Sequence, residues 1–284
     1  MGTAKAVNRR CIFCSNPANS GEHIWPKWMR DFLKRPGHIK RIETAHNYSK
    51  VAAPFGEVVQ RTSNGATHER KVYVVCGPCN NGWMNRYHEI PNRKLLEPML
   101  RGSDLSLDAD AQHSLARWVA LKTLVIEQDP DAGQPPTPIF TRRQTLNFRR
   151  TGAIPDSFRI WLAARGGDVW HDSLSQASGR FVLTPQPGTV DPDFVPAGRR
   201  RNAQAVTLGA GHLLIHALAV TYPYLDRRLV WEGPSGGIQI WPLPGGTIQW
   251  PPSTYLLDWA CEAVGRQFGT FARATPRRPP SKRD

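Results

Sequence analysis

Long hydrophobic segments are missing from this sequence. It contains no run of about 18 apolar residues, the length that a membrane-spanning helix needs. Its first residues include Lys5, Arg9 and Arg10 and lack the apolar centre of a secretion signal. We therefore expect a soluble, cytoplasmic protein with no membrane partner. Of the 284 residues 40% are hydrophobic, so the chain can bury a core, which excludes a wholly disordered protein.

Acidic residues are also scarce: 23 Asp and Glu stand against 37 Lys and Arg, which gives a formal net charge of +14. Residues 1–104 hold 17 basic and 8 acidic side chains, a net charge of +9. Residues 105–272 hold 15 basic and 14 acidic side chains, a net charge of +1. Residues 273–284 hold 5 basic side chains and 1 acidic side chain, a net charge of +4. This distribution favours a polyanionic partner that meets the N-terminal segment, because neutralised phosphates release counterions. The alternative is a basic surface that only keeps the protein soluble.

Cysteine is rare, and four of the five cysteines lie in two Cys-x-x-Cys pairs, Cys11 with Cys14 and Cys76 with Cys79. In a reducing compartment this spacing predicts a zinc site rather than disulfides. Four thiolates fill the tetrahedral coordination of zinc, so such a site is structural and leaves no open position for catalysis. A zinc ribbon without catalytic function remains the alternative. Cys261 is expected to be a buried thiol.

A Glu-His pair lies between the cysteine pairs, and an asparagine directly follows the last cysteine. Phosphodiester cleavage needs a nucleophilic water, a base to deprotonate it and positive charge on the leaving oxygen. His23 suits the base, because imidazole is mostly neutral at working pH. Glu22 and Asn80 offer the oxygen ligands that Mg²⁺ or Mn²⁺ prefers. The sequence therefore predicts two metals, with zinc stabilising the fold and the second cation serving the reaction.

The order Cys-x-x-Cys, Glu22-His23-Ile24-Trp25-Pro26, Cys-x-x-Cys-Asn80 resembles the HNH endonucleases, also called ββα-metal or His-Me finger nucleases, in their zinc-containing phage and bacterial type. The resemblance covers roughly residues 8–95. It implies that His23 is the general base and that Glu22 and Asn80 hold the catalytic divalent metal. It also implies that Cys11, Cys14, Cys76 and Cys79 hold structural zinc.

The sequence departs from the family pattern at three places. Glu22 stands where Asp is more usual, and 61 residues separate Cys14 from Cys76, so an insertion must loop out. For the middle Asn of the family motif, Asn64 is only a weak candidate and stays outside the catalytic set. Two further histidines, His212 and His216, lie in an apolar run and are expected in the core.

The helix after the second cysteine pair leaves three roles open. Asn80 or Asn81 could be the N-cap of this helix, a position that Asn favours, and Asn81 is the expected cap if Asn80 is a ligand. His88 and Glu89 lie on the same helix and could add a metal ligand or a phosphate contact.

The expected architecture is α+β, with an HNH module in residues 1–104, an α+β domain rich in strands in residues 105–272 and a disordered basic tail in residues 273–284. The clearest helix is predicted over residues 108–128, where apolar side chains recur at helical spacing. Shorter helices are predicted over 27–35, over 82–90 up to Pro91, and over 255–268. Strands are predicted over 21–28, 70–75, 158–163, 180–183, 205–208, 213–220, 228–231 and 237–241.

The predicted function is that of an HNH endonuclease that depends on a single catalytic divalent metal and hydrolyses DNA phosphodiesters, with double-stranded DNA as the partner. Residues 105–272 would position the substrate or a protein partner. The main alternative is a zinc-stabilised nucleic-acid-binding protein without catalysis. A toxin or defence effector would share the same chemistry.

Overall fold

The computed structural model describes residues 9–33, 49–52, 58–60, 70–129, 138–167, 172–179, 202–221, 229–231, 233–266 and 272–274. Helices and strands are mixed along the chain, as the α+β prediction requires. In the described residues no helix has the length and apolarity to cross a membrane.

The N-terminal unit consists of two strands followed directly by a helix. Strand β1 (Ser20–His23) pairs antiparallel with β4 (Lys71–Val75), and helix η3 (Pro78–Glu89) starts three residues after β4. A short 3₁₀ turn, η1 (Lys27–Met29), and helix α1 (Arg30–Leu33) follow β1. The predicted strand over 70–75 and the helix after Pro26 are thus confirmed. The strand predicted over 21–28 ends at residue 23, because Pro26 turns the chain into η1.

Helix η3 begins earlier than the sequence predicts and has a wider turn than an α-helix. Its first residue is Pro78, so Asn80 and Asn81 lie inside the helix and neither is its N-cap, contrary to the prediction. The backbone N–H of Ile90 bonds to the carbonyl of Asn85, five residues earlier. Pro91 was predicted to interrupt the helix, but it lies in the first turn of α2 (Ile90–Arg101), where proline fits.

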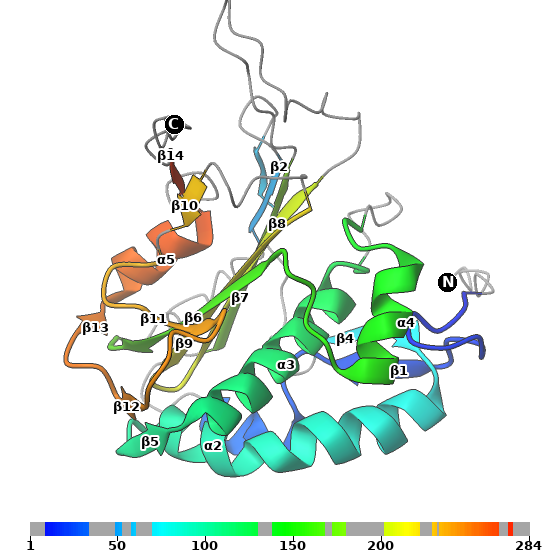
Figure 1. Cartoon of the computed structure of the whole chain (residues 1–284), viewed down its shortest axis with the longest axis horizontal. Coiled ribbons are helices and arrows are strands. Elements are labelled where there is room, and N and C mark those ends of the chain that lie inside the picture. The colour runs from blue at the N-terminus through cyan, green and yellow to red at the C-terminus, as the bar shows by residue number, and fades with distance from the viewer. Residues whose placement is uncertain are drawn as a thin grey trace, which may run out of the picture.

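The long helix predicted over residues 108–128 is confirmed as α3 (Ala109–Ile126). The Asp108 carboxylate caps its first turn by accepting the N–H of Ala111 at 2.8 Å. Helix α2 packs against α3, and the short strand β5 (Leu105–Leu107) that connects them pairs with β12 (Ile248–Trp250). Figure 1 shows α2 and α3 side by side below the large sheet.

The large sheet crosses the proposed boundary at residue 104. Its spatial order is β11-β6-β9-β8-β7-β2-β3, and β13 (Tyr255–Leu256) pairs parallel with β6. The strands are β2 (Ser49–Ala52), β3 (Val58–Gln60), β6 (Phe158–Arg165), β7 (Asp172–Gly179), β8 (Ala203–Ala210), β9 (Leu213–Val220) and β11 (Ile238–Trp241). The two strands at one end of this order, β2 and β3, belong to the insertion between the cysteine pairs.

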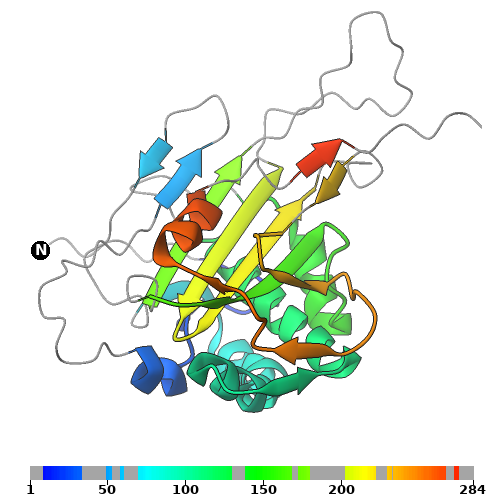
Figure 2. The same ribbon diagram turned by 90° about the vertical axis from the view of Figure 1, so that its left-hand side faces the viewer.

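Helices cover both faces of the sheet, with α3 on one face and α5 (Asp258–Arg266) on the other (Figures 1 and 2). Successive residues of a strand point to opposite faces, so each strand contributes to two cores. In β6, Ile160 and Leu162 belong to the main core, whereas Ala163 lies in a smaller core with Cys261 of α5. The expectation of a buried Cys261 thiol is thus confirmed.

Several elements differ from the sequence-based assignment. Helix α4 (Arg142–Thr151) and strand β7 were not predicted. The last helix is shorter than predicted, because residues 255 and 256 form β13. Strand β10 (Leu229–Trp231) pairs with β14 (Ala272–Ala274), which extends two residues into the predicted tail. The strand predicted over 180–183, residues 275–284 and Asn64 lie outside the described residues.

Candidate metal centre and catalytic site

The four paired cysteines meet at one point of the N-terminal unit. The sulfur atoms of Cys11, Cys14, Cys76 and Cys79 all lie within 4.8 Å of one another, and those of Cys14 and Cys76 are 3.4 Å apart. Four thiolates bound to one zinc ion at about 2.3 Å would be roughly 3.8 Å from each other. As predicted, the four cysteines are therefore close enough to hold a metal such as zinc.

Burial makes these thiols hard to ionise without a cation. It raises the pKa of Cys11 and of Cys79 above the ordinary thiol value. For Cys76 burial acts in the same direction, but the backbone N–H of Cys79 and the neighbouring thiols outweigh it and lower its pKa. Since the metal binds the thiolate, a bound cation would offset the cost of burying several negative sulfurs.

The local backbone explains how the cysteines converge. The first pair lies in a tight loop in which the N–H of Cys11 donates to the carbonyl of Asn16 at 2.8 Å. The second pair spans the junction between β4 and η3, so Cys79 sits in the first helical turn. The side chain of Asn19 ties the two loops by accepting the N–H of Gly77 at 3.1 Å. The β1–β4 pairing therefore brings together cysteine pairs that 61 residues separate in the sequence.

Helix α4 supports the first cysteine loop from outside the motif region. The Arg142 guanidinium donates to the carbonyls of Cys11 and Cys14 at 3.0 and 2.7 Å. The Thr145 hydroxyl donates to the carbonyl of Ile12 at 2.7 Å. A segment some 130 residues further along the chain thus fixes the loop that presents two of the four sulfurs.

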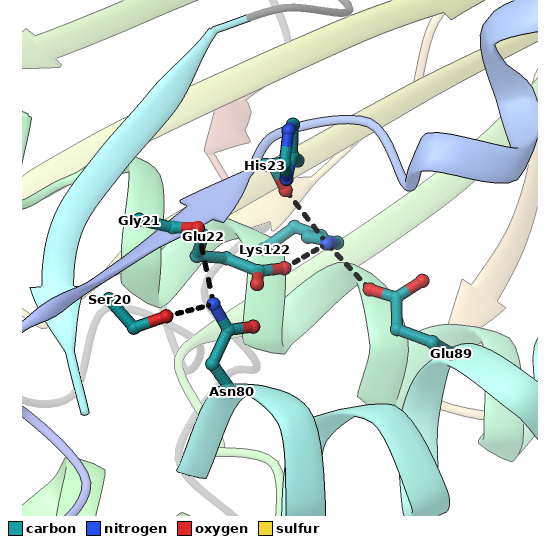
Figure 3. A network of polar contacts seen from close by, with 7 residues as sticks. All are labelled: Ser20, Gly21, Glu22, His23, Asn80, Glu89 and Lys122. Atoms are coloured by element: carbon teal, nitrogen blue, oxygen red, sulfur yellow. Dashed lines mark hydrogen bonds and ion pairs between the residues drawn. The ribbon is translucent and has the colours of Figure 1, made fainter. Parts of the chain in front are cut away.

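The Glu-His pair stands at the end of β1, where its two side chains point to opposite faces of the strand. Glu22 is buried and His23 is half-buried. In Figure 3 the His23 ring points away from the helix that carries Asn80. Burial lowers the pKa of His23, and the cations Lys71 and Lys27 lower it further. A neutral imidazole in a cationic environment is what a general base acting next to a phosphate requires.

The Glu22 carboxylate is already paired with a cation, the ammonium of Lys122 on α3. The Lys122 Nζ lies 2.5 Å from Glu22 Oε1 and 2.6 Å from Glu89 Oε1, and it donates to the carbonyl of His23 at 3.0 Å (Figure 3). We call Glu22, Glu89 and Lys122 the ion cluster. Burial lowers the pKa of Lys122, but the two carboxylates outweigh this effect and raise it above the ordinary lysine value.

Asn80 lies next to this cluster but is held by β1. Its amide nitrogen donates to the Ser20 hydroxyl at 2.9 Å and to the carbonyl of Gly21 at 3.2 Å. Figure 3 shows Asn80 and Glu89 pointing from the helix toward the same side. Nine residues are about two and a half turns of an α-helix, which would put the two on opposite faces. The wider turn of η3 brings them to one side.

A divalent metal does not fit these residues as they are arranged. Glu22, Glu89 and Asn80 offer the carboxylate and amide oxygens that Mg²⁺ prefers. However, the Lys122 ammonium takes up one oxygen of each carboxylate at hydrogen-bond distance. The predicted metal role of Glu22 and Asn80 stays a prediction.

The other histidines of interest have structural surroundings. His88 is buried beside Trp83 and stacks on Phe148, and burial lowers its pKa to about 3. His216 is buried in β9, as predicted, and its Nδ1 lies 2.8 Å from the Thr207 hydroxyl. His212 was predicted to be in the core as well, but it is exposed, because it lies in the turn between β8 and β9.

Sequence reasoning missed Lys122, although a signal was present. Leu115, Trp118 and Val125 form the apolar stripe of α3, and position 122 falls on the same stripe, four residues after Trp118. A lone lysine on a buried stripe indicates a buried partner, because an unpaired ammonium is too costly to bury. Its partners, in β1 and η3, could not be read from the spacing.

Helix α4 also presents a basic surface beside the cysteine cluster. It carries Arg142, Arg143, Arg149 and Arg150 and no acidic residue. Three of these arginines line a cleft of about 1060 Å³, together with polar side chains that include Asn147 and Asp156. The net charge of residues 105–272 is near zero and does not reveal this basic helix, because acidic residues elsewhere in the range offset the charge of its arginines.

Comparison with known proteins gives no relative: no family model, no curated protein and no solved structure matches this chain.

Proposed function

We propose that this chain is an HNH-type endonuclease that hydrolyses the phosphodiester bonds of DNA. The observation that carries the proposal is the order of elements around the cysteine cluster. Strand β1 ends in Glu22-His23, β4 pairs with it, and η3 follows with Asn80 in its first turn. The resemblance seen in the motifs thus coincides with a β-β-α arrangement, although no relative supports it.

In this proposal His23 accepts a proton from the attacking water. Its lowered pKa keeps the ring neutral, and its position at the end of β1 leaves it half-buried rather than enclosed. The exposed side chains of Lys27 and Lys71 would attract the phosphate to the same face. The zinc-binding cysteines would hold the strands and helix in place without entering the reaction.

A second candidate function is nucleic-acid binding without cleavage. The observation that favours it is the ion cluster, because Glu22 is tied to Lys122 and leaves the predicted catalytic metal without its main ligand. In that case the basic surface would bind DNA, and Glu22 and His23 would be relics of a lost activity.

Cleavage of supercoiled plasmid by the full chain tests the two candidates. We expect nicking or linearisation in Mg²⁺ or Mn²⁺, and a loss of about 100- to 10,000-fold in His23→Ala, as for removal of a general base. Zinc content and melting temperature should stay unchanged, because His23 lies at the margin of the core.

His212→Ala is the matched control, because this histidine is exposed in a distant turn. It should cleave like the natural sequence. Equal cleavage by His23→Ala would assign the activity to another base or to a contaminant. Plasmid binding without cleavage under any of the metal conditions would favour the binding protein.

A further inference from the structure

The ion cluster joins three segments that are far apart in the sequence. Glu22 comes from β1, Glu89 from the end of η3 and Lys122 from α3. The Lys122 side chain is only 1% exposed, so its ammonium is removed from water. A buried ammonium persists only where oxygen atoms replace its hydration.

Three oxygen atoms of the protein surround the Lys122 ammonium. The Lys122 Nζ donates hydrogen bonds to Glu22 Oε1 and to the carbonyl of His23, and it forms an ion pair with Glu89 Oε1 at 2.6 Å. Because the side chain is buried, the ammonium is out of reach of a substrate phosphate. Lys122 therefore does not act on the substrate directly and can influence it only through the residues that it holds.

The Lys122 ammonium occupies the position that a metal cation would take between its oxygen ligands. Two carboxylates and one carbonyl converge on a single nitrogen at 2.5 to 3.0 Å (Figure 3). The same oxygen types would surround a divalent metal. The two cations exclude each other, because a metal bound to Glu22 would face the positive charge of Lys122 at close range.

We propose that Lys122 replaces the divalent cation at Glu22 and is a positioning residue of the catalytic site. It binds the Glu22 side chain and the His23 carbonyl, and it fixes the end of β1 to the end of η3. In this arrangement Glu22 is not a metal ligand. The inference rests on the proposed function in one respect, because it takes His23 as the general base and names Lys122 as the residue that holds it in place.

Binding of Mn²⁺ to the zinc-loaded full chain, followed by electron paramagnetic resonance of free Mn²⁺, tests the inference without using cleavage. Glu22→Gln should change Mn²⁺ affinity less than about twofold, because Glu22 holds no metal in the natural chain. Lys122→Met should gain about one Mn²⁺ per chain, because it frees two carboxylates. The double variant Lys122→Met/Glu22→Gln should lose this gain.

A melting experiment separates positioning from packing. Lys122→Met buries two carboxylates without a partner, so it should melt at a lower temperature, and Mn²⁺ should raise that temperature again. Mn²⁺ should not raise the melting temperature of the triple variant Lys122→Met/Glu22→Gln/Glu89→Gln, which has no ionic ligand left. This triple variant is expected to fold better than Lys122→Met, because it leaves no buried charge without a partner.

The inference is overturned if the natural chain binds Mn²⁺ at a site that Glu22→Gln abolishes. It is also overturned if folded Lys122→Met gains no Mn²⁺ site. If Lys122→Met does not fold, comparing the Mn²⁺ affinity of Glu22→Gln with that of the natural chain still tests whether Glu22 is a metal ligand. Both outcomes differ from failure of the proposed function, which would show as absence of cleavage regardless of where Mn²⁺ binds.

Discussion

The cysteine cluster and the ion cluster are two groups of ionisable side chains in one small unit, and they differ in where a balancing cation would come from. The four cysteines lie close enough together to hold a metal ion, which would come from solution. The ion cluster contains its own cation, Lys122. A buried anion needs a counter-charge, and the chain can bind one from solution or provide one from a distant helix.

The two clusters also differ in which segments of the chain they join. The cysteine cluster connects the first loop to the start of η3, so it closes the N-terminal end of the unit. The ion cluster connects β1, the end of η3 and α3, so it attaches the unit to the rest of the protein. We therefore expect metal removal to affect folding and the ion cluster to affect the placement of β1.

The largest expected effect comes from breaking the cysteine cluster. Cys76→Ser should bind no zinc and should unfold the N-terminal unit, because zinc binding contributes about 10–16 kcal/mol to folding in small zinc domains. Glu89→Gln is the matched change in the ion cluster, and it should cost only about 1–3 kcal/mol, since Lys122 keeps two acceptors. Metal analysis and urea denaturation measure both. Equal stability losses in the two variants would remove the distinction between the clusters.

A smaller effect is expected from the helix that supports the cysteine loop. Arg142→Met removes two hydrogen bonds to the carbonyls of Cys11 and Cys14 and should cost about 1–3 kcal/mol, with faster release of zinc to a chelator. Arg143→Met is the control, because it changes the same charge on the same helix, one position further along. Equal rates of zinc release in the two variants would show that α4 does not support the cluster.

The smallest effect concerns DNA binding by the exposed arginines of α4. Arg143 and Arg149 are exposed on α4, so both side chains can reach phosphates. The double variant Arg143→Met/Arg149→Met should weaken binding and lower the log-log salt slope by about 0.9 for each phosphate that the variant no longer neutralises. Fluorescence anisotropy over a salt series measures this slope. An unchanged salt slope would mean that the proposed DNA-binding surface lies outside α4. The charge distribution along the sequence favours residues 1–104 for this role.

The sequence alone determined the features that depend on local order. The cysteine spacing predicted that the four thiols meet at one site, because the two sulfurs of a Cys-x-x-Cys pair converge where the loop is tight. The apolar period predicted α3, and the runs of apolar residues predicted β4, β6 and β9. The spacing of apolar residues does not predict that η3 has wider helical turns than an α-helix. The sequence therefore could not place Asn80 and Glu89 on the same side of this helix.

Only the tertiary structure decided what surrounds Glu22. The pairing of the Glu22 carboxylate with Lys122, 100 residues away, depends on how α3 packs against β4 and η3. The docking of α4 on the first cysteine loop and the entry of β2 and β3 into the large sheet also depend on distant contacts. Local sequence constrains the nearest few residues, whereas the partner of a buried charge is chosen by the packing of the whole chain.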